Sequence, residues 1–196
     1  MRLSVDGQAV GTEDFRVVTD PRLHVSPADL QAQFALAMKV RDRTTDANRG
    51  VLLVRGIRDQ VNERLTHTQD AGVRAAADAL LGRLAAIEDS LYNPRLRSSQ
   101  DPLNFPIRLN NKMAALMGVI ESAESAPTRQ SYEAFEDLSR RIDIQLNALN
   151  ALVATDLPRL NTLLAAQHLP PVRAEPQHPA PQPDAPAPHA EDEDEQ

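Results

Sequence analysis

The sequence of 196 residues contains no cysteine and no tryptophan, and aromatic residues make up only 3% of it. The absence of cysteine excludes a disulfide framework, thiolate metal sites and thiol chemistry. With so few aromatic side chains, leucine and alanine must build the core. No apolar run approaches the roughly 20 residues that cross a bilayer, and residues 1–7 lack the apolar stretch of a signal peptide. We therefore expect no membrane span and no export signal in this chain.

The excess of acidic residues is concentrated at the C-terminal end. Residues 170–196 hold seven of the 28 acidic residues and one of the 21 basic ones, so residues 1–169 carry 20 basic and 21 acidic side chains. The two signs alternate along the body, and the lack of a basic stripe argues against binding of nucleic acid. Eight of the 15 prolines also lie in residues 170–196, before an unbroken acidic run at 191–195. This composition predicts a disordered, Pro-rich acidic tail over 170–196.

The N-terminal residues 1–24 have the pattern of short β-strands. Residues 3–5 alternate between apolar and polar, Asp6-Gly7 is a turn pair, and residues 15–18 alternate again. A hairpin alone is at best marginally stable in water. These strands are therefore expected either to pack on the rest of the chain or to belong to a larger sheet.

Residues 25–169 carry apolar side chains at helical spacing. The first helix starts at Ser26, an N-cap followed by Pro27 and Asp29, and is expected to have a weak point at Gly50 and Gly56. Its apolar stripe is Leu30, Phe34, Ala37, Val40, Thr44, Ala47, Val51, Val54, Ile57, Val61 and Leu65.

Three further stripes follow at the same spacing. They are Val73, Ala77, Leu80, Leu84, Ile87 and Leu91; then Leu109, Met113, Leu116 and Ile120; then Phe135, Leu138, Ile142, Leu146, Leu149, Val153, Leu157, Leu160 and Leu164. Thr128 caps the last of these helices, and Pro158 is expected to kink it and to leave its end as a separate short piece.

Amphipathic helices joined by short links bury their stripes against one another. The expected fold is mainly α: an elongated antiparallel up-and-down bundle of three to four helices, with a short N-terminal β-hairpin and a disordered C-terminal tail. The pattern leaves open whether the second and third helices lie side by side or end to end.

No motif in the sequence indicates catalysis, a metal or a cofactor. Nucleotide-binding loops, serine-hydrolase elbows and zinc-protease signatures are absent, and the five histidines form no spaced cluster. Adjacent acids such as Glu88-Asp89 point about 100° apart on a helix, so we interpret them as solvated side chains rather than as an acid–base pair. We expect a protein that is not an enzyme.

A denser polar cluster opens the third helix. Asparagine is a poor helix former, and Asn104, Asn110 and Asn111 lie there with Arg108 and Lys112. The favoured interpretation is capping and hydrogen bonding between helices. The alternative is a patch that contacts a protein partner, with Asn104, Arg108, Asn111 and Lys112 as the candidate contact residues.

Three stretches together resemble one family. They are residues 20–22 followed by 26–43, then 100–112, which read QDPLNFPIRLNNK, and then 130–138, which read QSYEAFEDL. They are similar to the C-terminal helical region of large bacterial β-propeller proteins of the sortilin-like, BNR-repeat type, often labelled glycosyl hydrolase. The resemblance covers residues 1 to about 172. It implies that residues 1–24 are the last strands of a β-sandwich that joins propeller to helices, and that the parent family is extracytoplasmic.

The resemblance carries over no catalytic residue, because the propeller and its Asp-box repeats are missing from this chain. The expected function is that of a non-catalytic helical accessory or interaction module of such a propeller protein, from a fragment of a larger chain. The alternative is a free-standing helical scaffold that self-associates through its long helices.

Overall fold

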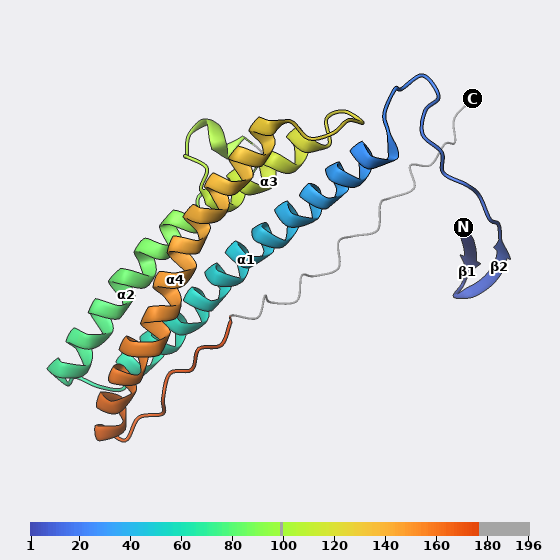
Figure 1. Cartoon of the computed structure of the whole chain (residues 1–196). Coiled ribbons are helices and arrows are strands. Elements are labelled where there is room, and N and C mark those ends of the chain that lie inside the picture. The colour runs from blue at the N-terminus through green and yellow to red at the C-terminus, as the bar shows by residue number, and fades with distance from the viewer. Residues whose placement is uncertain (99, 177–196) are drawn as a thin grey trace, which may run out of the picture.

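Two long helices, α1 (Pro27–Leu65) and α4 (Arg129–Ala166), run side by side in the same direction (Figure 1). Two shorter helices, α2 (Ala71–Leu91) and α3 (Leu109–Ile120), run in the opposite direction and pack against both of them. This computed structural model describes residues 1–98 and 100–176. The mainly α, elongated antiparallel bundle is confirmed.

The short helices α2 and α3 lie end to end. Each contacts α1 and α4, and the contact between α2 and α3 is slight. The connection 92–108, which includes the 3₁₀ turn η1 (Asp101–Leu103), lies where the two helices meet (Figure 1). Alongside α2 and α3 the bundle therefore has three helices in cross-section, and the two short helices together cover most of the length of their long neighbours.

The expected start of α1 is confirmed in detail. Ser26 Oγ accepts the backbone N–H of Asp29 at 3.2 Å, and Asp29 Oδ2 accepts the backbone N–H of Ser26 at 3.0 Å. These two reciprocal hydrogen bonds form a capping box, which satisfies two backbone N–H groups at the start of the helix. The hydrogen bonds from Ser26 lower the pKa of Asp29, because they stabilise its carboxylate form.

The stripes of α2 and α3 are confirmed, since all ten of their expected core residues are buried. The stripe of α1 is wrong at one position: Phe34 is 60% exposed, and Leu36 is buried instead. Figure 1 shows the first turns of α1 extending beyond the start of α4. This end of α1 lies beside the end of α3, where Gln33 Nε2 donates to the carbonyl oxygens of Ile120 and Ala123. Because fewer helices surround this end of α1, a smaller part of its circumference is buried there.

Both long helices are continuous, at the expected weak point of α1 and at the proline of α4. α1 is continuous through Gly50, which is buried where a Cβ atom would come within 2.7 Å of Leu146 Cδ2. The glycine thus permits close approach of α4. α4 likewise continues through Pro158, so the separate C-terminal piece is wrong. Burial of Leu157 and Leu160, on either side of the proline, offsets its cost of about 3 kcal/mol.

The N-terminal hairpin is present, although its second strand differs from the expected one. β1 (Arg2–Val5) pairs antiparallel with β2 (Gln8–Thr12), and residues 15–18 form no strand. The turn residues Asp6 and Gly7 have φ angles of 49° and 79°, as a two-residue type I′ turn requires, so pairing begins again directly after the turn. Every residue from 1 to 19 is exposed, and neither strand contacts a helix.

The body extends further than residue 169. Val172 is only 2% exposed. Its backbone N–H donates to Asn161 Oδ1 at 2.8 Å, and its carbonyl oxygen accepts from Asn161 Nδ2 at 2.9 Å. The side chain of Gln60 on α1 likewise accepts from the backbone N–H of Arg173 at 2.9 Å and donates to its carbonyl oxygen at 3.0 Å. The predicted tail boundary at 170 is therefore too early. Residues 177–196, the rest of the predicted tail, lie outside the described residues.

Within residues 1–98 and 100–176, the helices all fall short of the combination of length and apolar character that a membrane span requires.

Candidate functional site

The basic residues of the expected contact patch lie at the start of α3. Arg108 is the N-cap residue of this helix and Lys112 lies one turn further on. Arg108 Nη2 donates to both carboxylate oxygens of Asp89, at 2.8 Å each, which ties the start of α3 to the end of α2. This ion pair holds Arg108 at the junction of the two stacked helices.

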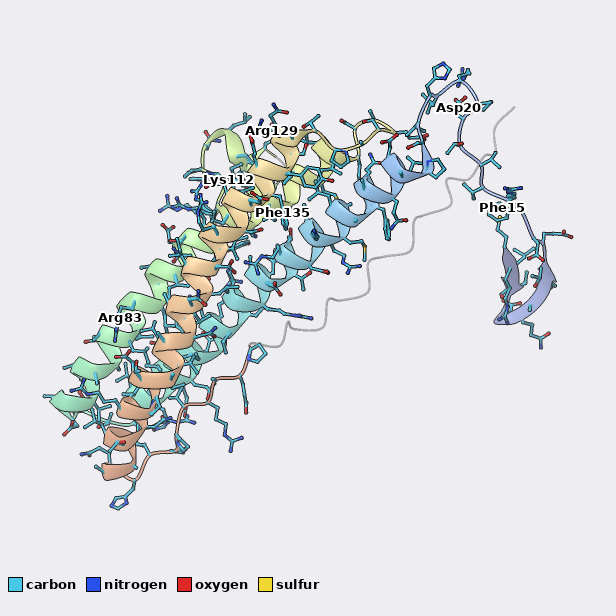
Figure 2. All side chains as sticks on the ribbon, in the orientation of Figure 1. Phe15, Asp20, Arg83, Lys112, Arg129 and Phe135 are labelled. Atoms are coloured by element: carbon cyan, nitrogen blue, oxygen red, sulfur yellow. The ribbon has the colours of Figure 1, made fainter. Side chains whose placement is uncertain are left out.

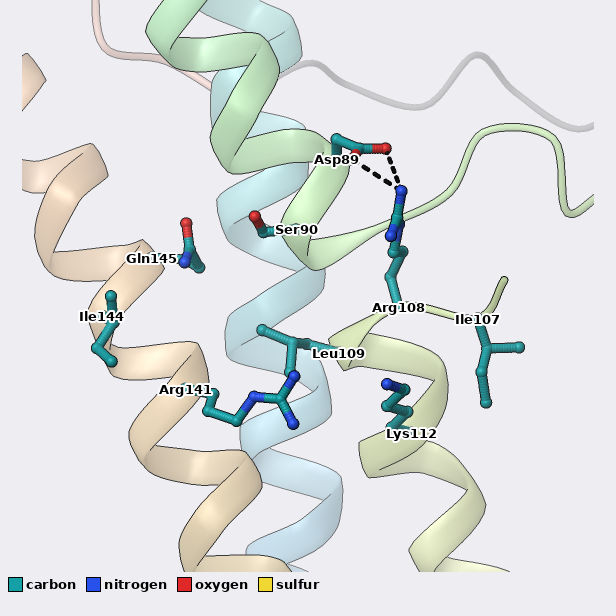
Figure 3. A pocket seen from close by; sticks show the side chains of 9 residues that line it. All are labelled: Asp89, Ser90, Ile107, Arg108, Leu109, Lys112, Arg141, Ile144 and Gln145. Atoms are coloured by element: carbon teal, nitrogen blue, oxygen red, sulfur yellow. Dashed lines mark hydrogen bonds and ion pairs between the residues drawn. The ribbon is translucent and has the colours of Figure 1, made fainter. Parts of the chain in front are cut away.

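An open cleft of about 350 Å³ lies beside this ion pair (Figure 3). α4 forms its other wall and contributes Arg141, Ile144 and Gln145. Figure 3 shows Arg141 extending from α4 towards the first turn of α3. Three cationic side chains from two helices therefore line the cleft, with one carboxylate, that of Asp89. The full lining is Asp89, Ser90, Ile107, Arg108, Leu109, Lys112, Arg141, Ile144 and Gln145.

Several donors at this cleft lack partners within the described part of the chain. The Nε atom of Arg108 is buried and has no hydrogen-bond acceptor there. The side chain of Arg108 does not cap α3, and the backbone N–H groups of Leu109 and Asn110 have no acceptor among the described residues, while that of Asn111 donates to Asn110 Oδ1. The helix dipole adds positive potential at this end. The site can therefore hold an anion.

The asparagines of the expected patch do not line this cleft. Asn104 is exposed on the connection before α3. Asn110 is buried, and its side chain donates to Asn48 of α1 at 3.2 Å and accepts the backbone N–H of Asn111 at 2.7 Å. Asn110 therefore forms a hydrogen bond between helices, as the favoured interpretation of the polar cluster predicts. Of the four candidate contact residues, the cleft contains Arg108 and Lys112.

The connection 92–108 is held in place by its own hydrogen bonds. Asn93 Nδ2 donates to the carbonyl oxygen of Pro106 at 2.9 Å, which joins the two ends of the connection. Asp101 accepts the backbone N–H groups of Arg97 and Ser98, and these bonds lower the pKa of its carboxyl group. A second hollow of about 330 Å³ lies between Asp89, Arg108 and this connection. Arg108 therefore separates two open hollows.

Glu88 departs from the solvated pair that the sequence predicted. It is 7% exposed and accepts from Arg55 Nε at 2.7 Å and from Arg58 Nη1 at 2.6 Å. Arg55 also lies over the ring of Tyr92, 4.9 Å from its centroid. Asp89, the next residue, is exposed, so the 100° rotation between neighbours places one acid inward and the other at the cleft. This buried group links α1 to α2.

Two charged residues of the cleft were not predicted from the sequence. Arg141 lies 29 positions after Lys112, and Asp89 lies 19 positions before Arg108. Only the packing of α4 against the α2–α3 junction brings them together. One signal was available: residues 102–120 contain two basic residues and no acidic one, in a chain of net charge −7.

The cleft contains one hydroxyl group besides its charged side chains. Ser90, its one hydroxyl, donates to the carbonyl oxygen of Ala86 at 2.9 Å, as in an ordinary helix. No group of three or more His, Asp or Glu side chains that could hold a metal ion occurs in the described ranges 1–98 and 100–176.

In comparisons with known proteins, the sequence matches no protein-family model, no curated protein and no solved structure.

Proposed function

We propose that this chain is a non-catalytic helical interaction module that joins a β-rich partner through its N-terminal hairpin. The partner class is the β-sandwich or β-propeller part of a BNR-repeat protein, because the stretches at 100–112 and 130–138 resemble the C-terminal helical region of such proteins. One observation carries the proposal: the hairpin is fully exposed and packs on no helix of its own chain.

The physical argument starts from the weakness of a two-stranded sheet. Such a sheet needs a further strand or an apolar cover to be stable. The hairpin has two unpaired edges, and Leu3, Val5 and Val10 are each more than half exposed. A sheet edge of a β-rich partner would satisfy the unpaired backbone groups and cover these side chains.

Apolar exposure continues after the hairpin. Phe15, Val17 and Val18 are 65%, 83% and 69% exposed, and Figure 2 shows Phe15 on the segment that stands away from the helices. Of the 13 large apolar side chains exposed in the described residues, eight lie in residues 1–23. Concentrated exposure of this kind marks an interaction surface.

The distribution disfavours the alternative, a scaffold that self-associates through its long helices. Self-association of that kind needs an unburied apolar stripe along a helix. On α1 and α4 the exposed large apolar side chains are Phe34, Tyr132 and Ile144, which are far apart along the helices. Their stripes are already used within the bundle.

The test measures backbone hydrogen exchange in residues 2–12, with and without the sandwich and propeller part of a BNR-repeat protein that lacks its own helices. The proposal expects fast exchange in the isolated chain and protection of at least about tenfold in the mixture. Val5→Lys should abolish that protection. The control Ile144→Lys, a matched change on α4, should leave it intact.

Light scattering distinguishes the alternative. The interaction module is a monomer alone and forms a one-to-one complex with the propeller protein. A stable dimer of the isolated chain that is lost in Ile144→Lys and kept in Val5→Lys would establish self-association through the helices and refute the proposal.

A further inference from the structure

The cleft at the α2–α3 junction has an excess of positive charge. Arg108, Lys112 and Arg141 line it with a single acid, Asp89. Lys112 has no acidic partner among the residues that the structure describes, and Arg141 has one distant partner, Asp137, at 3.6 Å. Elsewhere on the bundle many arginines are neutralised one to one. These pairs are Arg41–Asp42, Arg83–Asp156 and Arg129–Glu133.

The cleft also presents donors that suit carboxylates. The backbone N–H groups of Leu109 and Asn110, at the start of α3, have no acceptor among the described residues and lie next to the three side-chain charges. Charge-assisted hydrogen bonds to carboxylate oxygens are the strong class of hydrogen bond in proteins. An open cleft of about 350 Å³ accommodates more than one carboxylate side chain.

The chain itself carries the complementary ligand. Residues 191–195, which lie outside the described residues, read EDEDE and contribute five carboxylates in succession. No other segment of this sequence has five consecutive charges of one sign. We infer that this acidic segment binds the cleft of the same molecule, through Arg108, Lys112 and Arg141.

The connecting segment is long enough for this contact. Arg173 is bound to Gln60, whereas Asp143, in the α4 turn that lines the cleft, is bound to Arg43 at 2.5 Å. Gln60 and Arg43 are 17 residues apart on α1, which corresponds to about 26 Å along the bundle. Positions 173 and 191 are 18 residues apart, and a chain of that length can reach up to about 56 Å, which allows passage around the bundle as well. The inference concerns the helices and does not depend on the proposed role of the hairpin.

Carbodiimide cross-linking of the full chain tests the contact directly, because it joins an amine to a carboxylate that touches it. The sequence has only two lysines, so Lys112 reports on the cleft and Lys39, exposed on α1, is an internal control. We expect residues 191–195 to be joined to Lys112 about tenfold more often than to Lys39, with the product in the monomer. This preference should disappear in 1 M salt, where the Debye length is about 3 Å.

Three variants make the test specific. Arg141→Gln should lower the yield at Lys112 about threefold, whereas Arg140→Gln, its neighbour outside the cleft lining, should leave it unchanged. Asp89→Asn removes the competing carboxylate and should raise the yield, a gain that misfolding cannot produce. Equal joining to Lys39 and Lys112, a yield that survives 1 M salt, or products linking isotope-labelled to unlabelled copies would each overturn the inference.

Discussion

The buried carboxylate of Glu88 gives the sharpest stability prediction. Its two oxygens each accept a short hydrogen bond, from Arg55 and from Arg58, and its side chain is 9% exposed. Replacing it by glutamine preserves the shape and removes the charge. The new amide group can accept from one arginine and must turn its NH₂ group towards the other, so that two donors face each other.

The size of the effect follows from the exposure of the partners. A hydrogen bond to a charged group contributes about 1.5 to 3 kcal/mol, and breaking a fully buried ion pair costs about 3 to 5 kcal/mol. The side chains of Arg55 and Arg58 are 24% and 38% exposed, so water replaces part of what is lost. We therefore expect Glu88→Gln to lower the free energy of unfolding by about 2 to 3 kcal/mol.

The neighbouring acid provides the matched control. Asp89 has a side chain that is 64% exposed, and its ion pair with Arg108 is of the exposed kind that contributes at most about 1 kcal/mol. Urea denaturation followed by circular dichroism at 222 nm, for Glu88→Gln and Asp89→Asn, measures both effects. Equal losses for the two variants would refute the claim that the Glu88 group holds α1 to α2.

Four other outcomes follow from the same structure. Leu84→Ala should cost about 2 to 5 kcal/mol in urea denaturation, whereas Arg83→Ala should stay within about 1 kcal/mol; equal costs would mean that the buried face of α2 is misassigned. Gly82→Ala should raise the melting temperature through a gain of about 0.5 to 1 kcal/mol, because a Cβ atom there meets open space; a fall would show a hidden contact. Val172→Ala should cost about 1 to 2 kcal/mol, and an unchanged midpoint in urea would mean that residues 170–173 do not dock in solution. Asp29 has a lowered pKa, so its stabilising effect is present above its ordinary value of 3.8 and is lost as the pH falls through the folded value. The difference in melting temperature between the parent chain and Asp29→Asn should accordingly shrink below about pH 4, and a constant difference would contradict the capping role.

The sequence predicts the features that depend on local periodicity. The capping box at Ser26 and the buried faces of α2 and α3 involve residues within a few turns of one another, and a single helix determines them. The prediction fails where a distant segment decides. Phe34 has the spacing of a core residue, but its neighbours at the end of the bundle are too few to bury it.

The same distinction explains the candidate site. Arg108 and Lys112 are close in sequence and form a visible basic cluster without acids. Arg141 reaches the cleft only because α4 packs against the junction of two stacked helices. Glu88 was assigned to solvent because its partners, Arg55 and Arg58, lie about 30 residues earlier on another helix. Contacts between helices, which periodicity alone does not specify, account for each of these differences.

The end-to-end placement of α2 and α3 leads us to expect that the two parts of the bundle open separately. The core beside α2 is the larger one, since α2 has seven buried residues and the adjoining end of α4 adds Leu149, Leu152, Leu157, Leu160 and Leu164. The core beside α3 rests on the five buried residues of a 12-residue helix and on the facing half of α1. Because α2 and α3 touch so little, loss of α3 leaves the larger core closed. We therefore expect hydrogen exchange to be slower in α2 than in α3, with Lys112 and the first turn of α3 at the less stable end.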